Sequence, residues 1–425
     1  MTDFKPSGTL QFGAFFQGVN SSTVWKIPEA GSQIDFSSFT HLAKTAEKGN
    51  FVAFFLAEGL RPREQNGELY ELDVAGRPDS QTMLAALASV TDHIGLVATQ
   101  NATFNDPVDL ARRFQTLDFL SSGRAGWNVV TTDNAFTGAN FRRGAYLDHA
   151  DRYTHAQDVL DISKLIWSGK DVHYQGKHYS VDYHPGLPKA NPVIFQAGMS
   201  PEGRDFAACN ADVIFTRFGT PKESLEFRKD LVARCNRVDR DPNTLKIMPA
   251  AQFIVAPTEI EAFEKKKEVA ALQIGPQQAI AYLEQFWGRD LSSYDPDGPL
   301  PDVPPAIDET DGSRGTAFQA SGIKKKIAAW HQLADDNHWS IRDLATYELV
   351  DRQNLIVGSY SKVVDTLADY ARSGIVDGFN VCPWLIPTGL DDVVEHLVPL
   401  LQDRGIYPTE YAGENFRENL GLRGH

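Results

Sequence analysis

The sequence predicts an α/β protein in which eight β/α units close into a single (β/α)8 barrel. Three observations lead to this prediction. Short apolar runs rich in β-branched and aromatic residues occur eight times, and most are apolar on both faces, as buried parallel strands are. Amphipathic helical segments separate these runs. The 425 residues are enough for one such domain, so we expect a TIM barrel that spans residues 1–425.

The eight predicted strands follow one another along nearly the whole chain. In order they cover residues 11–16, 51–58, 95–101, 126–132, 192–198, 211–217, 248–256 and 377–384. An open doubly wound sheet is the alternative arrangement of such units. It is disfavoured because no Gly-x-Gly-x-x-Gly turn follows the first strand.

The predicted helices carry start and stop signals. Asp35 is an N-cap candidate for a helix with an apolar face that ends at Gly49. Further helices are expected over residues 107–120 and 148–167. Ser359 is a cap candidate for a late helix, and Gly374 is its predicted stop.

Residues 258–376 are too many for one β/α connection. A Pro-, Asp- and Gly-rich segment inside this interval, residues 292–313, predicts an extended, turn-rich loop. Long insertions at the carboxyl face of a barrel commonly form substrate lids. We therefore expect a long insertion between strands 7 and 8 that includes a lid-like loop. The C-terminal tail after the barrel is a candidate to cross an interface between protomers.

Charge and composition exclude several classes of function. The formal net charge of −15 disfavours nucleic acid and anionic membranes, both of which attract basic surfaces. No apolar run approaches the roughly 20 residues of a membrane span, and no secretory signal is present. Three widely spaced cysteines (Cys209, Cys235 and Cys382) predict neither a disulfide framework nor a zinc site. These features favour the cytoplasm.

Polar side chains gather at the end of the fourth predicted strand. Asn128, Thr131, Thr132 and Asp133 lie on or just after this strand. In α/β folds ligands bind at the carboxyl ends of the strands, so these groups are candidates to bind a polar, planar ligand. The alternative is a strand end whose polar groups only satisfy backbone.

The segment "QAGMSPEGRDFAA", residues 196–208, predicts a phosphate site. A strand ends at Gly198, Ser200 is a natural N-cap, and Pro201 occupies the favoured first position of a helix. A helix N-terminus approached through small residues presents N–H groups and the positive end of the helix dipole. The alternative is an ordinary capped helix.

Three other side chains are candidates for the same face. His149 and Tyr153 lie four residues apart on one predicted helix face, where both would reach a phosphate or a ring. Glu58 closes the second strand and is either catalytic or paired with Arg61 or Arg63. The alternative for His149 and Tyr153 is packing or surface exposure.

The chain has no sequence motif for a metal site or an activated nucleophile. It has no His-x-His, His-Glu-x-x-His or Gly-x-Ser-x-Gly pattern, so we expect no metal. A barrel without reactive groups of its own often depends on a cofactor. The residues alone leave FMN, a deazaflavin and pyridoxal phosphate open.

Several motifs resemble the bacterial luciferase-like flavin monooxygenases. They are "FFLAEG", "ARRFQTLDFLSSGR", "SGRAGWNVVTT", "LDHADRY", "VIFQAGMSPEGRDFAA", "DGFN" and "VPLLQDRGIY". The resemblance is to the branch that contains nitrilotriacetate monooxygenase, pristinamycin IIA synthase, dibenzothiophene-sulfone monooxygenase and long-chain alkane monooxygenase. The motifs extend in matching order from about Phe12 to Leu420.

The resemblance implies a two-component, FMN-dependent monooxygenase. Reduced FMN would come from a separate NAD(P)H:FMN reductase, and O2 would react through a C4a-(hydro)peroxyflavin to oxygenate a small organic substrate. The resemblance also implies a homodimer or homotetramer. An F420-dependent oxidoreductase on the same fold and a non-catalytic flavin-binding protein are the alternatives.

The resemblance also implies a set of cofactor-binding residues. They are Glu58, Thr99, Asn101, Thr131, Thr132, His149, Tyr153, Gly198, Met199 and Ser200. Two departures from the family pattern bear on catalysis. Many relatives have Asp at the position of Glu58, and the extra methylene moves the carboxylate. Several relatives have a histidine in the loop after the first strand, where this chain offers Asn20. Asn20 and Glu58 are therefore the candidate catalytic residues.

Overall fold

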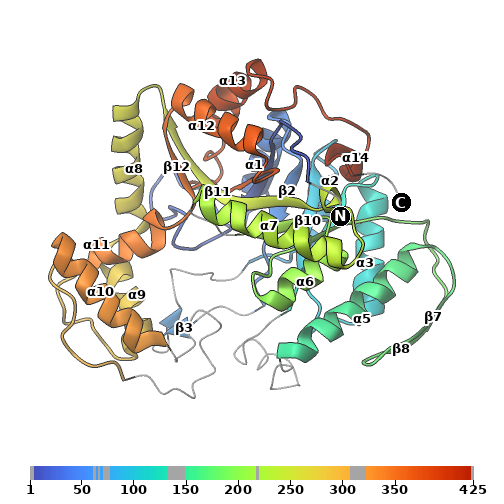
Figure 1. Ribbon diagram of the computed structural model, residues 1–425, viewed down its shortest axis with the longest axis horizontal. Helices are drawn as coiled ribbons and strands as arrows, with labels where there is room; N and C mark the ends of the chain where they lie inside the picture. The colour runs from blue at the N-terminus through green and yellow to red at the C-terminus, as the bar shows by residue number, and fades with distance from the viewer. Residues whose placement is uncertain are drawn as a thin grey trace.

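The computed structural model describes residues 4–60, 77–131, 149–216, 220–306 and 322–422, with the backbone alone at 64–65, 68–69 and 149–150. Eight parallel strands form a closed barrel (Figure 1). They are β1 (Gln11–Phe16), β2 (Ala53–Leu56), β5 (Gly95–Asn101), β6 (Ala125–Val130), β9 (Val193–Gln196), β10 (Val213–Thr216), β11 (Lys246–Ala256) and β13 (Gly378–Val381). Because β10 pairs with β11, the ring closes. The predicted TIM barrel and all eight predicted strands are confirmed.

Helices cover the outside of this barrel (Figure 1). They are α1 (Phe36–Lys48), α2 (Ser80–Ala88), α3 (Pro107–Leu120), α5 (His149–Trp167), α6 (Pro201–Asn210), α7 (Pro221–Arg237), α12 (Tyr360–Ser373), η6 (Val393–Leu397) and α13 (Val398–Asp403). Two short hairpins lie in the connections. One pairs β3 (Glu64–Gln65) with β4 (Glu68–Leu69), and the other pairs β7 (Val172–Gln175) with β8 (Ser180–Tyr183). A short 3-10 helix, η1 (Pro242–Thr244), precedes β11. No helix in the ranges described is long and apolar enough to cross a membrane.

The structure confirms two of the predicted helix-end residues, Ser359 and Gly374, and differs from the prediction at Asp35. The Ser359 side chain accepts the Lys362 N–H at the start of α12, and Gly374 ends that helix with a φ of 61°. Both predictions are confirmed. Asp35 occupies the N-cap position of α1, but its side chain accepts no capping hydrogen bond. The predicted cap is wrong in this respect, because the Ser32 hydroxyl oxygen accepts the Asp35 N–H and shapes the turn instead.

The segment between β11 and β13 builds a helical body with its own apolar core. It contains α8 (Glu259–Gln273), α9 (Pro276–Trp287), α10 (Ile323–Asn337), α11 (Ile341–Thr346) and η5 (Tyr347–Asp351), and it leads into β12 (Leu355–Ser359). These helices lie to one side of the barrel in Figure 1. Their side chains bury Leu283, Trp287 and Ile341 completely. The ninth parallel strand, β12, was not predicted, and it pairs with the second half of β11.

The C-terminal tail closes the amino end of the barrel. The ring of Phe416, in α14 (Phe416–Asn419), fills the space above two glycines, since a Cβ at Gly95 would lie 2.4 Å from that ring. Arg417 donates two hydrogen bonds to Asp212, of 2.8 and 2.9 Å. The described tail therefore packs on its own barrel rather than extending away from it.

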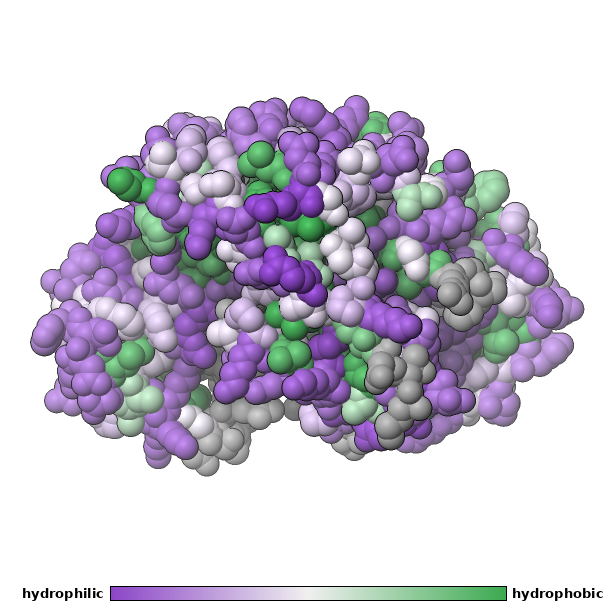
Figure 2. Space-filling model, turned by 45° about the horizontal axis from the view of Figure 1, so that its top comes forward, coloured by the Kyte–Doolittle hydropathy of each residue, from purple (hydrophilic) through white to green (hydrophobic). Residues whose placement is uncertain are grey.

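Figure 2 shows a largely hydrophilic surface with separate apolar spots.

Candidate functional site

Most predicted site residues come together at the carboxyl ends of the strands. Thr99 and Asn101 lie at the end of β5, Thr131 follows β6, and residues 198–200 connect β9 to α6. Tyr153 lies in the second turn of α5. Because α14 closes the opposite end of the barrel, this face is the open end for a ligand. Thr132 and the side chain of His149 lie outside the described residues.

The N-terminus of α6 forms a tight cradle around one phenol. The Ser200 hydroxyl oxygen accepts the Gly203 N–H at 3.1 Å, and Pro201 is the first residue of the helix, as predicted. A Cβ at Gly198 would lie 2.9 Å from the Tyr153 hydroxyl oxygen, and a Cβ at Gly203 would lie 2.8 Å from it. Glycine at both positions therefore allows the phenol to approach the helix start.

This cradle has the chemistry of an anion site. The first turn of a helix presents backbone N–H groups and the positive end of the helix dipole. Arg204 donates from Nε to the carbonyl oxygen of Met199 at 2.9 Å, which holds the turn before the helix. His149 begins α5 one turn before Tyr153, so its backbone is on the same side. A phosphate fits such a set of residues.

Asn128 and Thr99 form a buried polar pair inside the barrel. The Asn128 Nδ2 donates to the Thr99 Oγ1 at 3.0 Å across neighbouring strands. Asn128 is 3% exposed, and its Oδ1 accepts no hydrogen bond from the part of the chain described. An unmade hydrogen bond on a buried polar group costs about 1–3 kcal/mol, so this oxygen is a candidate acceptor for a donor on a ligand.

Asn101 forms hydrogen bonds within the turn after β5. Its side-chain oxygen accepts the N–H groups of Thr103 at 2.7 Å and Phe104 at 3.2 Å, which forms the turn after β5. The side chain therefore shapes this turn. The backbone N–H of Asn101 donates to the Glu58 carboxyl group instead. The predicted cofactor contact of the Asn101 side chain stays a prediction.

Glu58 follows β2 at the same face and has a strongly shifted proton affinity. Burial, and to a smaller extent the charge of Asp79, raise its pKa from 4.5 to about 8. The Asn101 N–H and the positive charge of Arg113 oppose this shift. At neutral pH Glu58 is thus mostly protonated and able to donate a hydrogen bond. A perturbed carboxyl at the mouth of a barrel is typical of a functional group.

Asn20 is occupied within its own loop. Its side-chain oxygen accepts the Ser22 N–H at 2.8 Å, and its Nδ2 donates to Gln17 at 2.8 Å. The carbonyl oxygen of Ser22 accepts from Gln252 in β11 at 2.9 Å and from Gln273 in α8 at 2.6 Å. These bonds hold the loop after β1 between the barrel and the insertion. A catalytic role for Asn20 stays a prediction.

Sequence reasoning missed Asn380, in β13. Asn380 is 3% exposed, and its Oδ1 has no hydrogen-bond partner in the described ranges. The detectable signal was one polar residue at an inward position of an otherwise apolar strand. In the sequence, the motif "DGFN" carries only the family resemblance.

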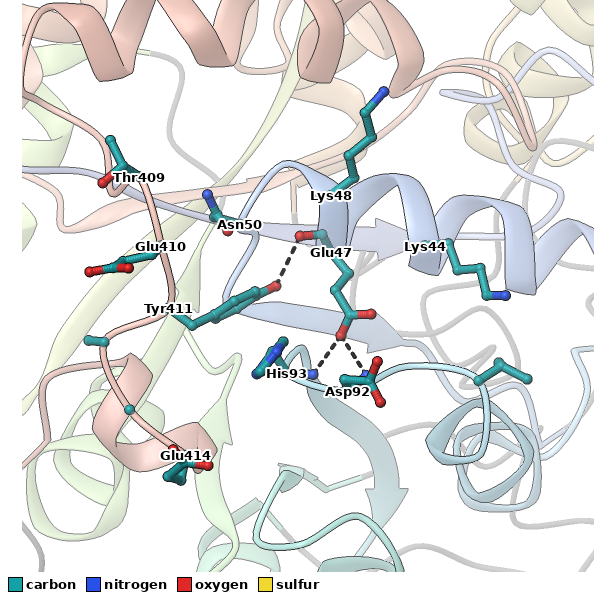
Figure 3. Close-up of a pocket in the computed structure, with 13 residues that line it drawn as sticks. Lys44, Glu47, Lys48, Asn50, Asp92, His93, Thr409, Glu410, Tyr411 and Glu414 are labelled. Atoms are coloured by element: carbon teal, nitrogen blue, oxygen red, sulfur yellow. Dashed lines mark hydrogen bonds between the residues drawn. The ribbon is translucent and has the colours of Figure 1, made fainter.

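A cavity of about 800 Å³ lies at the other end of the barrel, between α1, the turn before β5 and the tail (Figure 3). One oxygen of Glu47 accepts the N–H groups of Asp92 at 2.9 Å, His93 at 2.6 Å and Ile94 at 3.0 Å. The Tyr411 hydroxyl donates to the Phe51 carbonyl oxygen at 2.8 Å. Because these groups already bind one another far from the carboxyl ends, this cavity is not the predicted site.

Among the described residues no cluster of His, Cys, Asp or Glu is arranged to hold a metal ion.

Two curated relatives match nearly the whole chain. A component of pristinamycin IIA synthase from Streptomyces pristinaespiralis is 37% identical, and the match covers 94% of this chain and 92% of that protein. N-acetyl-S-(2-succino)cysteine monooxygenase from Bacillus subtilis is 33% identical, with 97% and 96% covered. The first of them belongs to the branch that the motifs indicated.

A solved structure supports the same relationship. The crystal structure of riboflavin lyase with modified FMN and the substrate riboflavin superimposes with a TM-score of 0.78 at 28% identity. The match covers 97% of this chain and 96% of that chain. The family model described as luciferase-like monooxygenase matches residues 10–377. The chain therefore belongs to the luciferase-like monooxygenases, a family of flavin-dependent monooxygenases.

Proposed function

We propose that this protein is the monooxygenase component of a two-component system, which uses reduced FMN and O2 to oxygenate a small organic substrate. A separate NAD(P)H:FMN reductase would supply the reduced FMN. The observation that carries the proposal is the cradle at α6, where Gly198 and Gly203 lie against the Tyr153 hydroxyl and Ser200 caps the helix. The pristinamycin IIA synthase relative is by its name one part of a multi-component enzyme, which supports the two-component arrangement.

The described residues fit FMN at two places. The phosphate would bind at the N-terminus of α6, with the Tyr153 hydroxyl and His149 beside it. The ring would lie across the ends of β5 and β6, where Thr99 and the unpaired Asn128 Oδ1 offer hydrogen bonds to its polar edge. When bound and reduced, FMN supplies the electrons that activate O2.

The chain itself would contribute a proton and a dry site. Glu58, whose pKa is about 8, holds a proton at neutral pH next to the turn after β5. The rings of Phe15, Phe55 and Phe215 contact one another inside the barrel and would offer an apolar surface below the bound flavin. The insertion between β11 and β13 would act as the lid that excludes water. Exclusion of water strengthens polar interactions with the bound reactants.

The first experiment mixes the purified chain with photoreduced FMN under argon and then adds oxygenated buffer in a stopped-flow spectrometer. We expect tight binding of reduced FMN and a near-ultraviolet transient that free FMN does not give. Added substrates are then ranked by how fast the transient decays. Reoxidation at the rate of free FMN would contradict the proposal. Binding of F420 in place of FMN would favour the deazaflavin alternative, and FMN binding without the transient would favour a non-catalytic protein.

A further inference from the structure

The strand registers arrange the inward side chains of the barrel in layers. In eight-stranded barrels each layer holds four side chains from alternate strands. Following the register from β2 through β6 and β10 to β13 gives one layer of Phe55, Asn128, Phe215 and Asn380. Two of its four members are asparagines, at positions that usually carry bulky apolar residues.

The two phenylalanines of this layer separate the two asparagines. β2 and β10 are opposite each other in the ring, and their Phe55 and Phe215 rings stack with centroids 5.7 Å apart at 23°. β6 and β13 are also opposite, so Asn128 and Asn380 lie on either side of this aromatic pair. The layer therefore carries one polar side chain on each side of the aromatic pair, Asn128 from β6 and Asn380 from β13.

The surroundings of Asn380 are uncharged and small. A Cβ at Gly13 would lie 2.7 Å from the Asn380 Oδ1, and Ala250 pairs with Asn380 in the register. The Ala53 Cβ lies 3.6 Å from the same Cβ position at Gly13. A buried water needs two or more polar partners, and these neighbours supply none from their side chains. The unpaired Oδ1 of Asn380 is thus left without a donor from these side chains.

We infer that Asn380 binds the substrate of the proposed reaction, and that it selects substrates that insert an uncharged hydrogen-bond donor, such as a secondary amide N–H or a hydroxyl. The inference rests on the proposed function, in which FMN occupies the β5 and β6 side. A carboxylate or an ammonium group is disfavoured there, because the neighbouring interior side chains carry no opposite charge. A hydrocarbon or a sulfone would leave the Asn380 oxygen without a donor.

The direct test compares two probes that differ by one N–H group. Crystals of the full chain are soaked with N-methylacetamide or with N,N-dimethylacetamide at equal concentration. We expect N-methylacetamide to donate to Asn380 Oδ1 and the dimethyl compound to be absent there, with a solution preference of about tenfold. The matched control is Thr91→Val, which changes a buried polar side chain at the amino end of the barrel and should leave this binding unchanged. A water alone on Asn380, or equal occupancy of both amides, would overturn the inference.

Thermal unfolding of Asn380→Leu provides a second measurement, with Asn380→Ser as the smaller variant. If Asn380 serves a ligand, replacing the side chain that carries the unpaired oxygen keeps or raises the melting temperature while amide binding is lost. A fall in melting temperature in both variants would make Asn380 a structural residue and overturn the inference. Amide binding is measured without flavin, so a failure of FMN to bind would count against the proposed function only.

Discussion

The amino and carboxyl ends of this barrel use buried polar groups in opposite ways. At the amino end the oxygens of the buried carboxylates Asp118 and Asp377 accept hydrogen bonds. Asp377 accepts from Arg228 at 2.5 Å and from the Ile247 N–H at 2.8 Å. At the carboxyl end the side-chain oxygens of Asn128, Gln196, Thr216 and Asn380 accept nothing from the described residues. We therefore expect the amino end to contribute mainly stability and the carboxyl end to offer its acceptor oxygens to a ligand.

The comparison predicts the largest loss of stability at the amino end. Asp377→Ala leaves Arg228 buried without its carboxylate, so we expect the free energy of unfolding to fall by about 3–5 kcal/mol. Urea denaturation measures this change. Asp369→Ala, which breaks an exposed pair with Arg372, is the matched control and should cost at most about 1 kcal/mol. Equal losses of unfolding free energy in the two variants would contradict the view that the buried pair at the amino end stabilises the fold.

At the carboxyl end, the pH dependence of stability should depend on Glu58. Its pKa is about 8 in the folded chain and about 4.5 when unfolded, so the folded state binds the extra proton between these values. The contribution of Glu58 to the free energy of unfolding is therefore complete below pH 4.5. It is lost as the pH rises toward 8, by up to about 1.4 kcal/mol per pH unit. Glu58→Gln should remove this slope in urea titrations from pH 5 to 9. An unchanged slope would show that Glu58 is not the titrating group.

The next effect concerns FMN affinity. Tyr153→Phe removes the hydroxyl that lies against Gly198 and Gly203, and we expect reduced FMN to bind about tenfold more weakly. Anaerobic fluorescence titration measures the dissociation constant. Tyr407→Phe is the matched control, because the Tyr407 hydroxyl donates to the Gly49 carbonyl oxygen at the amino end. That variant should lose stability and keep its FMN affinity, and the reverse pattern would contradict the assignment of the two ends.

The smallest expected effect is at α6 itself. Ser200→Ala removes the cap on the Gly203 N–H, so we expect a loss of about 1 kcal/mol in unfolding free energy and a several-fold loss in FMN affinity. Ser359→Ala removes an equivalent cap on α12, away from the cradle. The Ser359→Ala variant should lose about the same unfolding free energy and keep its affinity for FMN. A matching loss of FMN affinity in both variants would mean that the effect is general.

The sequence by itself determined the eight strands, the barrel they form and the caps at Ser200 and Ser359. These features depend on signals within a few residues, namely apolar runs and N-cap side chains followed by helix-forming segments. It also identified the Ser200 and Tyr153 elements as one candidate site, because both follow strands and share the carboxyl face.

Only the tertiary structure decided which polar groups are occupied and which are open. Asn20 and Asn101 form hydrogen bonds within their own turns, whereas Asn128 and Asn380 keep an unpaired oxygen inside one barrel layer. Strand register around a closed ring sets that layer, and burial raises the pKa of Glu58. Register, closure and burial depend on segments hundreds of residues apart, so no local pattern in the sequence specifies them.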